Sequence, residues 1–112
     1  MRVLYTPAME EYLDELESIL YEKGYYGTEE MACKYVDDLT NDIENELPNK
    51  RHIPAPKYYD KYYKGMFYAT FRKNRHTQWH PFFTKHERNG ETIYIVRYIG
   101  NNHTDAHHLY NK

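Results

Sequence analysis

The chain has 112 residues, a formal net charge of −2 and a single cysteine, Cys33. This length predicts one domain over residues 1–112 and excludes a cleft between two large domains. A single cysteine excludes an internal disulfide and a cysteine-based zinc finger, and it favours a reducing compartment, the cytoplasm. The sequence has no apolar run of about 18 residues and no signal-peptide pattern, so we expect no contact with a membrane.

Two amphipathic helices are predicted in the first half of the chain. Thr6 and Pro7 are typical of an N-cap followed by proline at the first helical position, and apolar side chains then recur at three- and four-residue steps. Gly24 is a typical residue just after a helix C-terminus. Thr28 begins a second helix of the same kind, and Pro48 ends it. The two helices and their short connection favour an αα-hairpin packed on an apolar surface.

After Gly65 the hydrophobic pattern changes to the two-residue period of strands. Pro81 stands inside one of these strands, where it demands an edge position or a bulge. Asn89 and Gly90 are the strongest short signal for a hairpin turn. Together with a short strand before the helices, the predicted strands cover residues 2–5, 66–73, 78–86 and 92–99. The order β-α-α-β-β-β predicts an α+β fold, with the helical hairpin on one face of a small, mainly antiparallel sheet.

The charges are divided between the two halves. Residues 1–47 hold 13 acidic and 3 basic side chains, whereas residues 48–112 hold 4 acidic and 12 basic ones. All seven histidines also lie in the second part. This asymmetry favours a basic working surface on an acidic support, or alternatively two solvated faces of opposite sign that pair with each other.

A basic and aromatic segment follows the proline-rich loop. Its cations are Lys57, Lys61, Lys64, Arg72, Lys73 and Arg75. Lysine and arginine neutralise phosphates and exposed aromatic rings stack bases, so this segment is a candidate RNA-binding surface. The tyrosines of the doubled motif over 57–64 either take part in that stacking or pack beneath the sheet. The secondary structure of this motif is left open.

The order and size of these elements resemble the RelE/ParE superfamily of bacterial toxins from toxin–antitoxin pairs. The step Thr6-Pro7-Ala8 is similar to the opening of the family's first helix. The run Gln78-Trp79-His80-Pro81-Phe82-Phe83 is similar to its middle strand. The run Tyr94-Ile95-Val96-Arg97-Tyr98-Ile99-Gly100, followed by Asn101, Asn102 and His103, is similar to its last strand and the turn after it. The resemblance spans nearly the whole chain, although no single motif is specific.

The resemblance implies a toxin that either cuts messenger RNA on the ribosome, as RelE types do, or binds DNA gyrase, as ParE types do. It places the family's middle-strand arginine on His80 and its basic positions on the preceding strand near Tyr68, Thr70 and Arg72. Later family positions fall near Asn102, His103, His107, His108 and Tyr110. Because the usual lysine and arginine are mostly replaced, the chain is closer to a histidine-based variant.

Cleavage of RNA through its own 2′-hydroxyl needs a base, an acid and positive charge on the phosphate, and it needs no metal. Histidine suits both proton roles because its ordinary pKa is about 6.5. We therefore predict that His80, His103 and His107 carry the proton chemistry and that Arg72 or Arg75 holds the phosphate. RNA contacts are predicted for Lys57, Lys61, Lys64, Lys73, Arg75, Tyr68, His108 and Tyr110.

Two further features concern metals and Arg97. His103 and His107 have the helical spacing of a metal-binding pair, but no third ligand follows at suitable spacing, so neither a metal nor another cofactor is predicted. Arg97, inside an apolar strand, either faces the concave surface or pairs with an acid of the helical hairpin, and we expect the pairing.

The function therefore has one preferred interpretation and two alternatives. The preferred one is a metal-independent endoribonuclease toxin that acts on messenger RNA at the ribosome. The alternatives are a non-enzymatic toxin that binds DNA gyrase, and a diverged RNA- or protein-binding module without catalysis. The resemblance also implies a cognate antitoxin, whose acidic and apolar side chains would cover the basic face.

Overall fold

The computed structural model describes residues 2–110, and of residue 110 only the backbone. Three α-helices and a mixed sheet of six strands form an α+β fold, so the predicted class is confirmed. In chain order the elements are β1 (Arg2–Tyr5), α1 (Pro7–Glu22), α2 (Glu29–Glu46), η1 (Leu47–Asn49), β2 (Ile53–Pro54), η2 (Lys57–Lys61), β3 (Phe67–Tyr68), β4 (Phe71–Asn74), β5 (Thr77–Arg88), β6 (Glu91–Asn101) and α3 (Asn102–Tyr110). None of the described helices has the length and apolar character needed to cross a bilayer.

The helical hairpin begins and ends where its capping residues predict. The Thr6 hydroxyl accepts a hydrogen bond from the backbone N–H of Met9 at 3.3 Å, and the Thr28 hydroxyl accepts one from Met31 at 3.1 Å. Each bond satisfies a donor that the first helical turn leaves free. Gly24 follows α1 with φ of +76°, a conformation that glycine adopts without steric cost.

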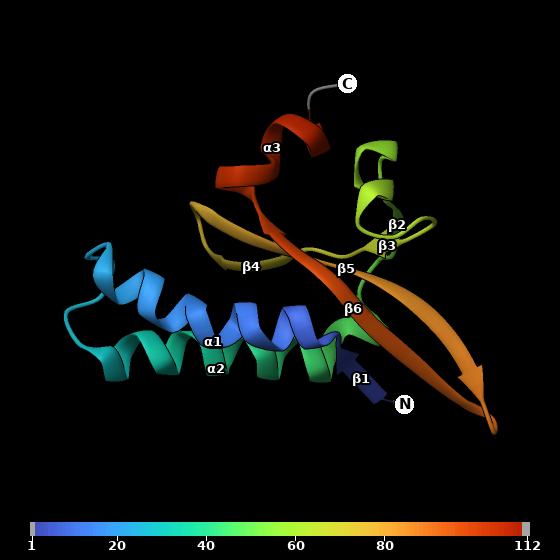
Figure 1. Ribbon diagram of the computed structural model, residues 1–112, viewed down its shortest axis with the longest axis horizontal. Helices are drawn as coiled ribbons and strands as arrows, with labels where there is room; N and C mark the ends of the chain where they lie inside the picture. The colour runs from blue at the N-terminus through green and yellow to red at the C-terminus, as the bar shows by residue number, and fades with distance from the viewer. Residues whose placement is uncertain (1, 111–112) are drawn as a thin grey trace.

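The hairpin covers one face of the sheet (Figure 1). The main core lies between them and is formed by Leu13, Leu16, Val36, Leu39, Ile43, Leu47, Ala69, Phe71, Trp79, Phe83, Tyr94, Val96 and Ile99. The opposite face is covered by η2 and α3, with a smaller core of Tyr59, Met66, Tyr68, Phe82 and Leu109. Two core layers therefore share one sheet, and the strand alternation assigns residues to each.

The sheet is antiparallel except at one edge. Its order is β1-β6-β5-β3-β2, and β4 also pairs with β5. Strand β1 runs parallel to β6, with Arg2 opposite Ile93 and Tyr5 opposite Val96. The β5–β6 turn has positive φ at both Asn89 (53°) and Gly90 (76°), as a two-residue hairpin turn requires. The predicted hairpin is therefore confirmed.

The structure excludes one of the two alternatives for Pro81, the edge position. Strand β5 is central, not at an edge, because it pairs with β6 on one side and with β3 and β4 on the other. The Pro81 carbonyl accepts a hydrogen bond from Ala69 at 3.3 Å, in the gap between β3 and β4. The nitrogen of a strand residue faces the same side as its carbonyl. Proline has no backbone N–H, and at Pro81 the missing donor would face the gap between β3 and β4. The hydrogen-bond ladder on that side of β5 is already interrupted there.

Three elements differ from the predicted order. The strand expected over 66–73 is divided into β3 and β4, and the loop after η1 contains the short strand β2. The doubled tyrosine motif begins with the 3₁₀ helix η2. The segment after β6 forms α3, which carries no long apolar stripe; of its side chains over residues 102–109, those of Asp105 and Leu109 are buried.

Candidate nucleic-acid interface

The acidic side chains of the first half are gathered in one layer of the molecule. Helices α1 and α2 carry all 13 acidic residues of the first half, on the side of the sheet away from η2 and α3 (Figure 1). Among the described residues, a single ion pair joins an acid of the first half to a cation of the second, Lys73 Nζ to Asp42 at 3.6 Å. The two signs therefore mostly do not neutralise each other, which favours the interpretation of a basic surface on an acidic support.

A surface of exposed rings and cations lies on the η2 side of the sheet. We call it the aromatic–basic face, and its residues are Tyr58, Lys61, Tyr62, Tyr63, Arg97 and His108. The three tyrosines are 40%, 43% and 42% exposed, whereas the fourth tyrosine of the motif, Tyr59, is fully buried. One tyrosine of the motif therefore packs beneath and three remain open, and the stacking of bases on the open rings stays a prediction.

The cations of this face lie on its rings. Lys61 Nζ donates to the Tyr58 hydroxyl at 2.7 Å and lies 4.0 Å from the centre of that ring. The hydrogen bond to Tyr58 raises the pKa of Lys61. Tyr62 stacks on Tyr98 with ring centres 4.2 Å apart, and His108 stacks on Tyr58 at 3.4 Å. The face thus presents aromatic rings with positive charge already positioned beside them.

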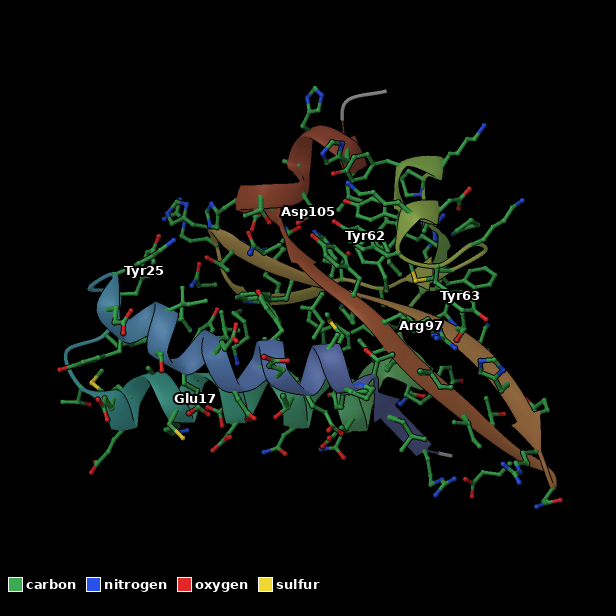
Figure 2. The ribbon with its side chains drawn as sticks, in the orientation of Figure 1. Glu17, Tyr25, Tyr62, Tyr63, Arg97 and Asp105 are labelled. Carbon is green, nitrogen blue, oxygen red and sulfur yellow. The ribbon has the colours of Figure 1, made fainter. Side chains whose placement is uncertain are left out.

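Arg97 corrects one prediction. We expected a pair with an acid of the helical hairpin, but the guanidinium lies 3.7 Å from the centre of the Tyr63 ring, on the opposite side of the sheet (Figure 2). The Arg97 Nε donates to the Thr84 hydroxyl at 3.0 Å. The side follows from strand alternation, because Tyr94 and Val96 face the hairpin core and Arg97 therefore faces the other way. A β-bulge at Arg97, where Tyr98 pairs with Phe82 and Val96 with Phe83, then brings Tyr98 to the same side as Arg97.

A buried carboxylate fastens η2 and α3 to the sheet. Asp105 on α3 is 2% exposed, and it accepts hydrogen bonds from four donors. These are the hydroxyl of Tyr59 at 2.7 Å, the hydroxyl of Tyr98 at 3.2 Å, the backbone N–H of Asn101 at 3.2 Å and the hydroxyl of Thr104 at 2.6 Å. Burial, and then the nearby Asp105 charge, raises the pKa of both tyrosines, so both hydroxyls keep their protons and donate.

His80 and Tyr68 do not lie on the open surface that their predicted roles require. The His80 ring is fully buried, with Nδ1 3.2 Å from the Thr70 hydroxyl and the Tyr68 ring packed edge-on at 5.8 Å. Tyr68 itself is 8% exposed and belongs to the smaller core. Tyr68 stands on the face that η2 and α3 cover, and its predicted RNA contact stays a prediction.

Burial gives His80 a measurable pH dependence. Burial lowers the pKa of His80, an effect that the Asp105 charge and a backbone hydrogen bond only partly oppose. A depressed folded pKa means that the unfolded chain binds the proton first, so the free energy of unfolding should fall as pH drops below about 6.5. The loss is about 1.4 kcal/mol for each unit of pKa difference. Urea unfolding at about pH 7.5 and about pH 5.5 should show a smaller change for His80→Gln than for the wild type. Equal changes would contradict this role.

The tail histidines lie apart from His80. His103 and His107 are exposed on α3, and His103 Nε2 is 3.3 Å from the Thr77 hydroxyl at the start of β5. The His107 and His108 rings are 5.2 Å apart, and His108 joins the aromatic–basic face. The structure therefore brings two tail histidines together but does not join them to His80 in one open site. The predicted catalytic set stays a prediction.

The remaining predicted contacts divide between the two sides. Lys57 and Lys64 are exposed on or beside η2, close in sequence to the aromatic–basic face. Arg72 and Arg75 are also exposed, and Arg72 Nε donates to the Asn74 carbonyl at 3.2 Å. Lys73 instead turns toward the hairpin, where it pairs with Asp42 and lies 5.3 Å from the Tyr35 ring centre. Its predicted RNA contact, on the hairpin side, stays a prediction.

The prediction for Tyr110 falls on a side chain outside the described residues, although its backbone ends α3. Sequence reasoning missed Asp105, Arg97 as a ring partner, and the support that Tyr98 gives to Tyr62. The sequence carries a signal for Arg97 and Tyr98, because two residues with polar groups stand next to each other within an apolar strand. Strict alternation would turn one of them toward the apolar core, so the pair indicates a bulge. No comparable signal marks Asp105.

One group of possible metal ligands occurs among the described residues. Single ligand atoms of Glu17, Cys33 and Asp37 lie within 4.8 Å of one another on the outer surface of the hairpin. Hydrogen bonding to Glu17 is the main cause that raises the pKa of the Cys33 thiol, with burial and the charge of Asp37 acting in the same direction.

Comparison of the chain with protein-family models, with curated proteins and with solved structures finds no match to any of them.

Proposed function

We propose that this chain is a RelE/ParE-like toxin domain that binds single-stranded RNA through its aromatic–basic face. One observation carries the proposal: Tyr58, Tyr62 and Tyr63 expose 40–43% of their surface directly beside Lys61 and Arg97. Single-stranded RNA is bound in this way because every base offers a ring for stacking and every nucleotide offers a phosphate for a cation.

The contacts within the face explain how it would bind without large rearrangement. Lys61 and Arg97 are held over tyrosine rings, and Tyr62 is supported from beneath by Tyr98. Side chains that are already ordered lose less entropy when a ligand binds. The outer surface of the acidic hairpin on the other side of the sheet repels RNA, so the charge distribution favours approach to this face.

The proposed partner of the toxin is a cognate antitoxin that competes for the same surface. Exposed rings flanked by lysines suit a segment that alternates apolar and acidic side chains. Binding of that segment would cover the rings and neutralise Lys61 and Arg97, so toxin activity and antitoxin binding would exclude each other.

A second candidate function is metal-independent cleavage of the bound RNA. The observation that favours it is the pair His107 and His108, whose rings are 5.2 Å apart at the border of the aromatic–basic face. Two imidazoles at such a position supply an acid and a base to RNA lying on the rings. This version of the nuclease does not use His80. It predicts that His107→Ala removes cleavage while RNA binding is retained.

RNA binding should depend on Tyr63 and Lys61. Tyr63→Leu removes a stacking ring and should weaken the binding of a short single-stranded RNA about fivefold or more. Lys61→Gln should reduce the slope of log affinity against log salt by about 0.7, the value of one phosphate contact. Fluorescence anisotropy across a series of salt concentrations measures both effects. The matched controls are Tyr21→Leu and Lys34→Gln, which change the same residue types on the exposed surface of the hairpin.

Two outcomes would count against the proposal. Equal losses in the control variants would mean that binding is not located on the aromatic–basic face. Growth arrest on expression without measurable RNA binding by the purified chain would favour a protein target such as DNA gyrase. The same RNA, analysed on a gel after each titration, shows whether cleavage accompanies binding.

A further inference from the structure

A cavity lies away from the aromatic–basic face. It has a volume of about 500 Å³ and opens where the connection between α1 and α2 approaches the β4–β5 turn and the start of α3. Figure 2 labels Tyr25 at this end of the hairpin. Small-molecule sites commonly have volumes of about 300–1,000 Å³ and combine apolar walls with a few polar groups. This cavity has both features.

One wall of the cavity is aromatic. It consists of Tyr12, Tyr25, Tyr26, Tyr35 and Trp79. The Tyr26 and Tyr35 ring centres are 5.3 Å apart, and Tyr35 meets Trp79 edge-on at 6.5 Å. The Trp79 Nε1 donates to the Tyr35 hydroxyl at 2.8 Å, which fixes both rings. An ordered series of rings therefore runs from the open rim, where Tyr25 is 68% exposed, to the nearly buried Trp79.

The other wall is polar and is held in place by backbone hydrogen bonds. The side-chain oxygen of Asn101 accepts from the N–H groups of His103 and Thr104 at 2.8 and 3.1 Å. The side-chain oxygen of Asn74 accepts from the N–H of His76 at 2.8 Å. These bonds fix the side-chain amides of Asn74 and Asn101. Because the oxygen of each amide is held, the orientation of its NH₂ group is fixed as well. Fixed amide groups and aromatic rings in the lining of one cavity suit a flat heterocycle that stacks and also accepts hydrogen bonds at its edge.

The charge of the cavity differs from that of the hairpin around it. No carboxylate is among its described lining residues, although α1 and α2 hold most of the acids of the chain. Lys23 and His103 line it. A neutral to positive cavity within an acidic layer favours a ligand that carries negative charge beside its flat ring.

We propose that this cavity binds a purine nucleotide, with the base on the tyrosine–tryptophan wall and the phosphate near Lys23 and His103. A purine offers a large stacking surface and several edge acceptors, and its phosphate supplies the negative charge. The nucleotide has two possible sources, a free nucleoside monophosphate or one residue of an RNA strand. The inference does not depend on RNA binding at the aromatic–basic face, which lies on the other side of the sheet.

Trp79 provides the test because it is the only tryptophan of the chain. Its fluorescence, excited at wavelengths where nucleotides do not absorb, is followed while the full chain is titrated with AMP or GMP. A saturable change is expected, whereas ribose 5-phosphate and inorganic phosphate should produce none. Lys23→Gln should weaken AMP binding without affecting adenosine. Tyr26→Leu should weaken both about fivefold or more, and Tyr21→Leu, outside the cavity, should leave them unchanged.

A parallel titration with a purine-rich RNA oligonucleotide separates the two sources. If the oligonucleotide gives a change that depends on Tyr26 and the mononucleotides give none, the ligand is a residue of an RNA strand. Circular dichroism melting curves test whether Tyr26→Leu is folded. If that variant is unfolded, the loss of AMP binding in the surface variant Lys23→Gln tests the proposal instead. No saturable change with any purine ligand, or the same change in wild type and Tyr26→Leu, would overturn the proposal.

Discussion

Gly100→Ala should destabilise the protein by about 3 kcal/mol or more, the largest effect that we expect from adding one methyl group. A Cβ at this position would lie 2.5 Å from both Cγ and Oδ1 of Asp105. The site cannot relax easily, because Gly100 is paired with His80 in the β5–β6 ladder and Asp105 is held by four hydrogen bonds. The methyl group must therefore displace the carboxylate from its donors or separate the strands.

Thermal unfolding measures the effect, and the expected loss corresponds to a decrease in Tm of roughly 10–20 °C. The matched control is Gly27→Ala in the connection between α1 and α2. A Cβ there meets nothing within 4 Å, and Gly27 has no left-handed φ. The control should therefore leave Tm nearly unchanged. A Gly100→Ala variant as stable as the control would show that α3 does not pack against β6 in the way described.

Much of the fold was predictable because its signals are local. The threonine hydroxyls at Thr6 and Thr28 satisfy helix N–H groups three residues away, and Asn89-Gly90 adopts the positive φ values that its hairpin turn needs. The strand alternation also identified the two faces of the sheet, with Phe71 on one and Tyr68 on the other. Each of these rules depends on residues within a few positions of one another.

The missed features depend on contacts between distant segments. Helix α3 has no strong apolar stripe, and it is held by Asp105, whose partner Tyr59 lies 46 residues away in sequence. The sequence gives no sign that an aspartate in a polar tail is buried. His80 was placed correctly on a strand, but alternation cannot tell what covers the face on which a side chain stands. Its burial follows from the packing of η2 and α3.

The same contacts connect stability to the proposed function. Asp105 binds Tyr59 of η2 and Tyr98 of β6, and these two tyrosines lie beneath or beside the exposed rings of the aromatic–basic face. Tyr59 packs edge-on against Tyr58 at 5.0 Å, and Tyr98 stacks under Tyr62 at 4.2 Å. The carboxylate thus orders a surface that it does not itself reach. We call the Asp105 carboxylate the anchor of this face. We expect substitutions of the anchor to weaken RNA binding, although they remove no group that would touch RNA.

Asp105→Asn tests both consequences, because it preserves size and removes two acceptor sites. An aspartate accepts at both oxygens, whereas asparagine has one acceptor oxygen and an NH₂ group that would face donors. At least one buried hydroxyl or N–H would lose its partner, and we expect a loss of about 3 kcal/mol in the free energy of unfolding. Asp60→Asn is the control, since the Asp60 carboxylate on η2 is half-buried and no described donor binds it.

Two measurements separate the anchor from a merely stabilising contact. Urea unfolding gives the loss of stability, and limited proteolysis under native conditions should cut near η2 faster in Asp105→Asn than in Asp60→Asn, because η2 is released first. RNA affinity should fall in the anchor variant and not in the control, at a temperature where both remain folded. If Asp105→Asn loses less than about 1 kcal/mol and binds RNA normally, the carboxylate does not order the aromatic–basic face, and the tyrosines of η2 are held by packing on Phe82 alone.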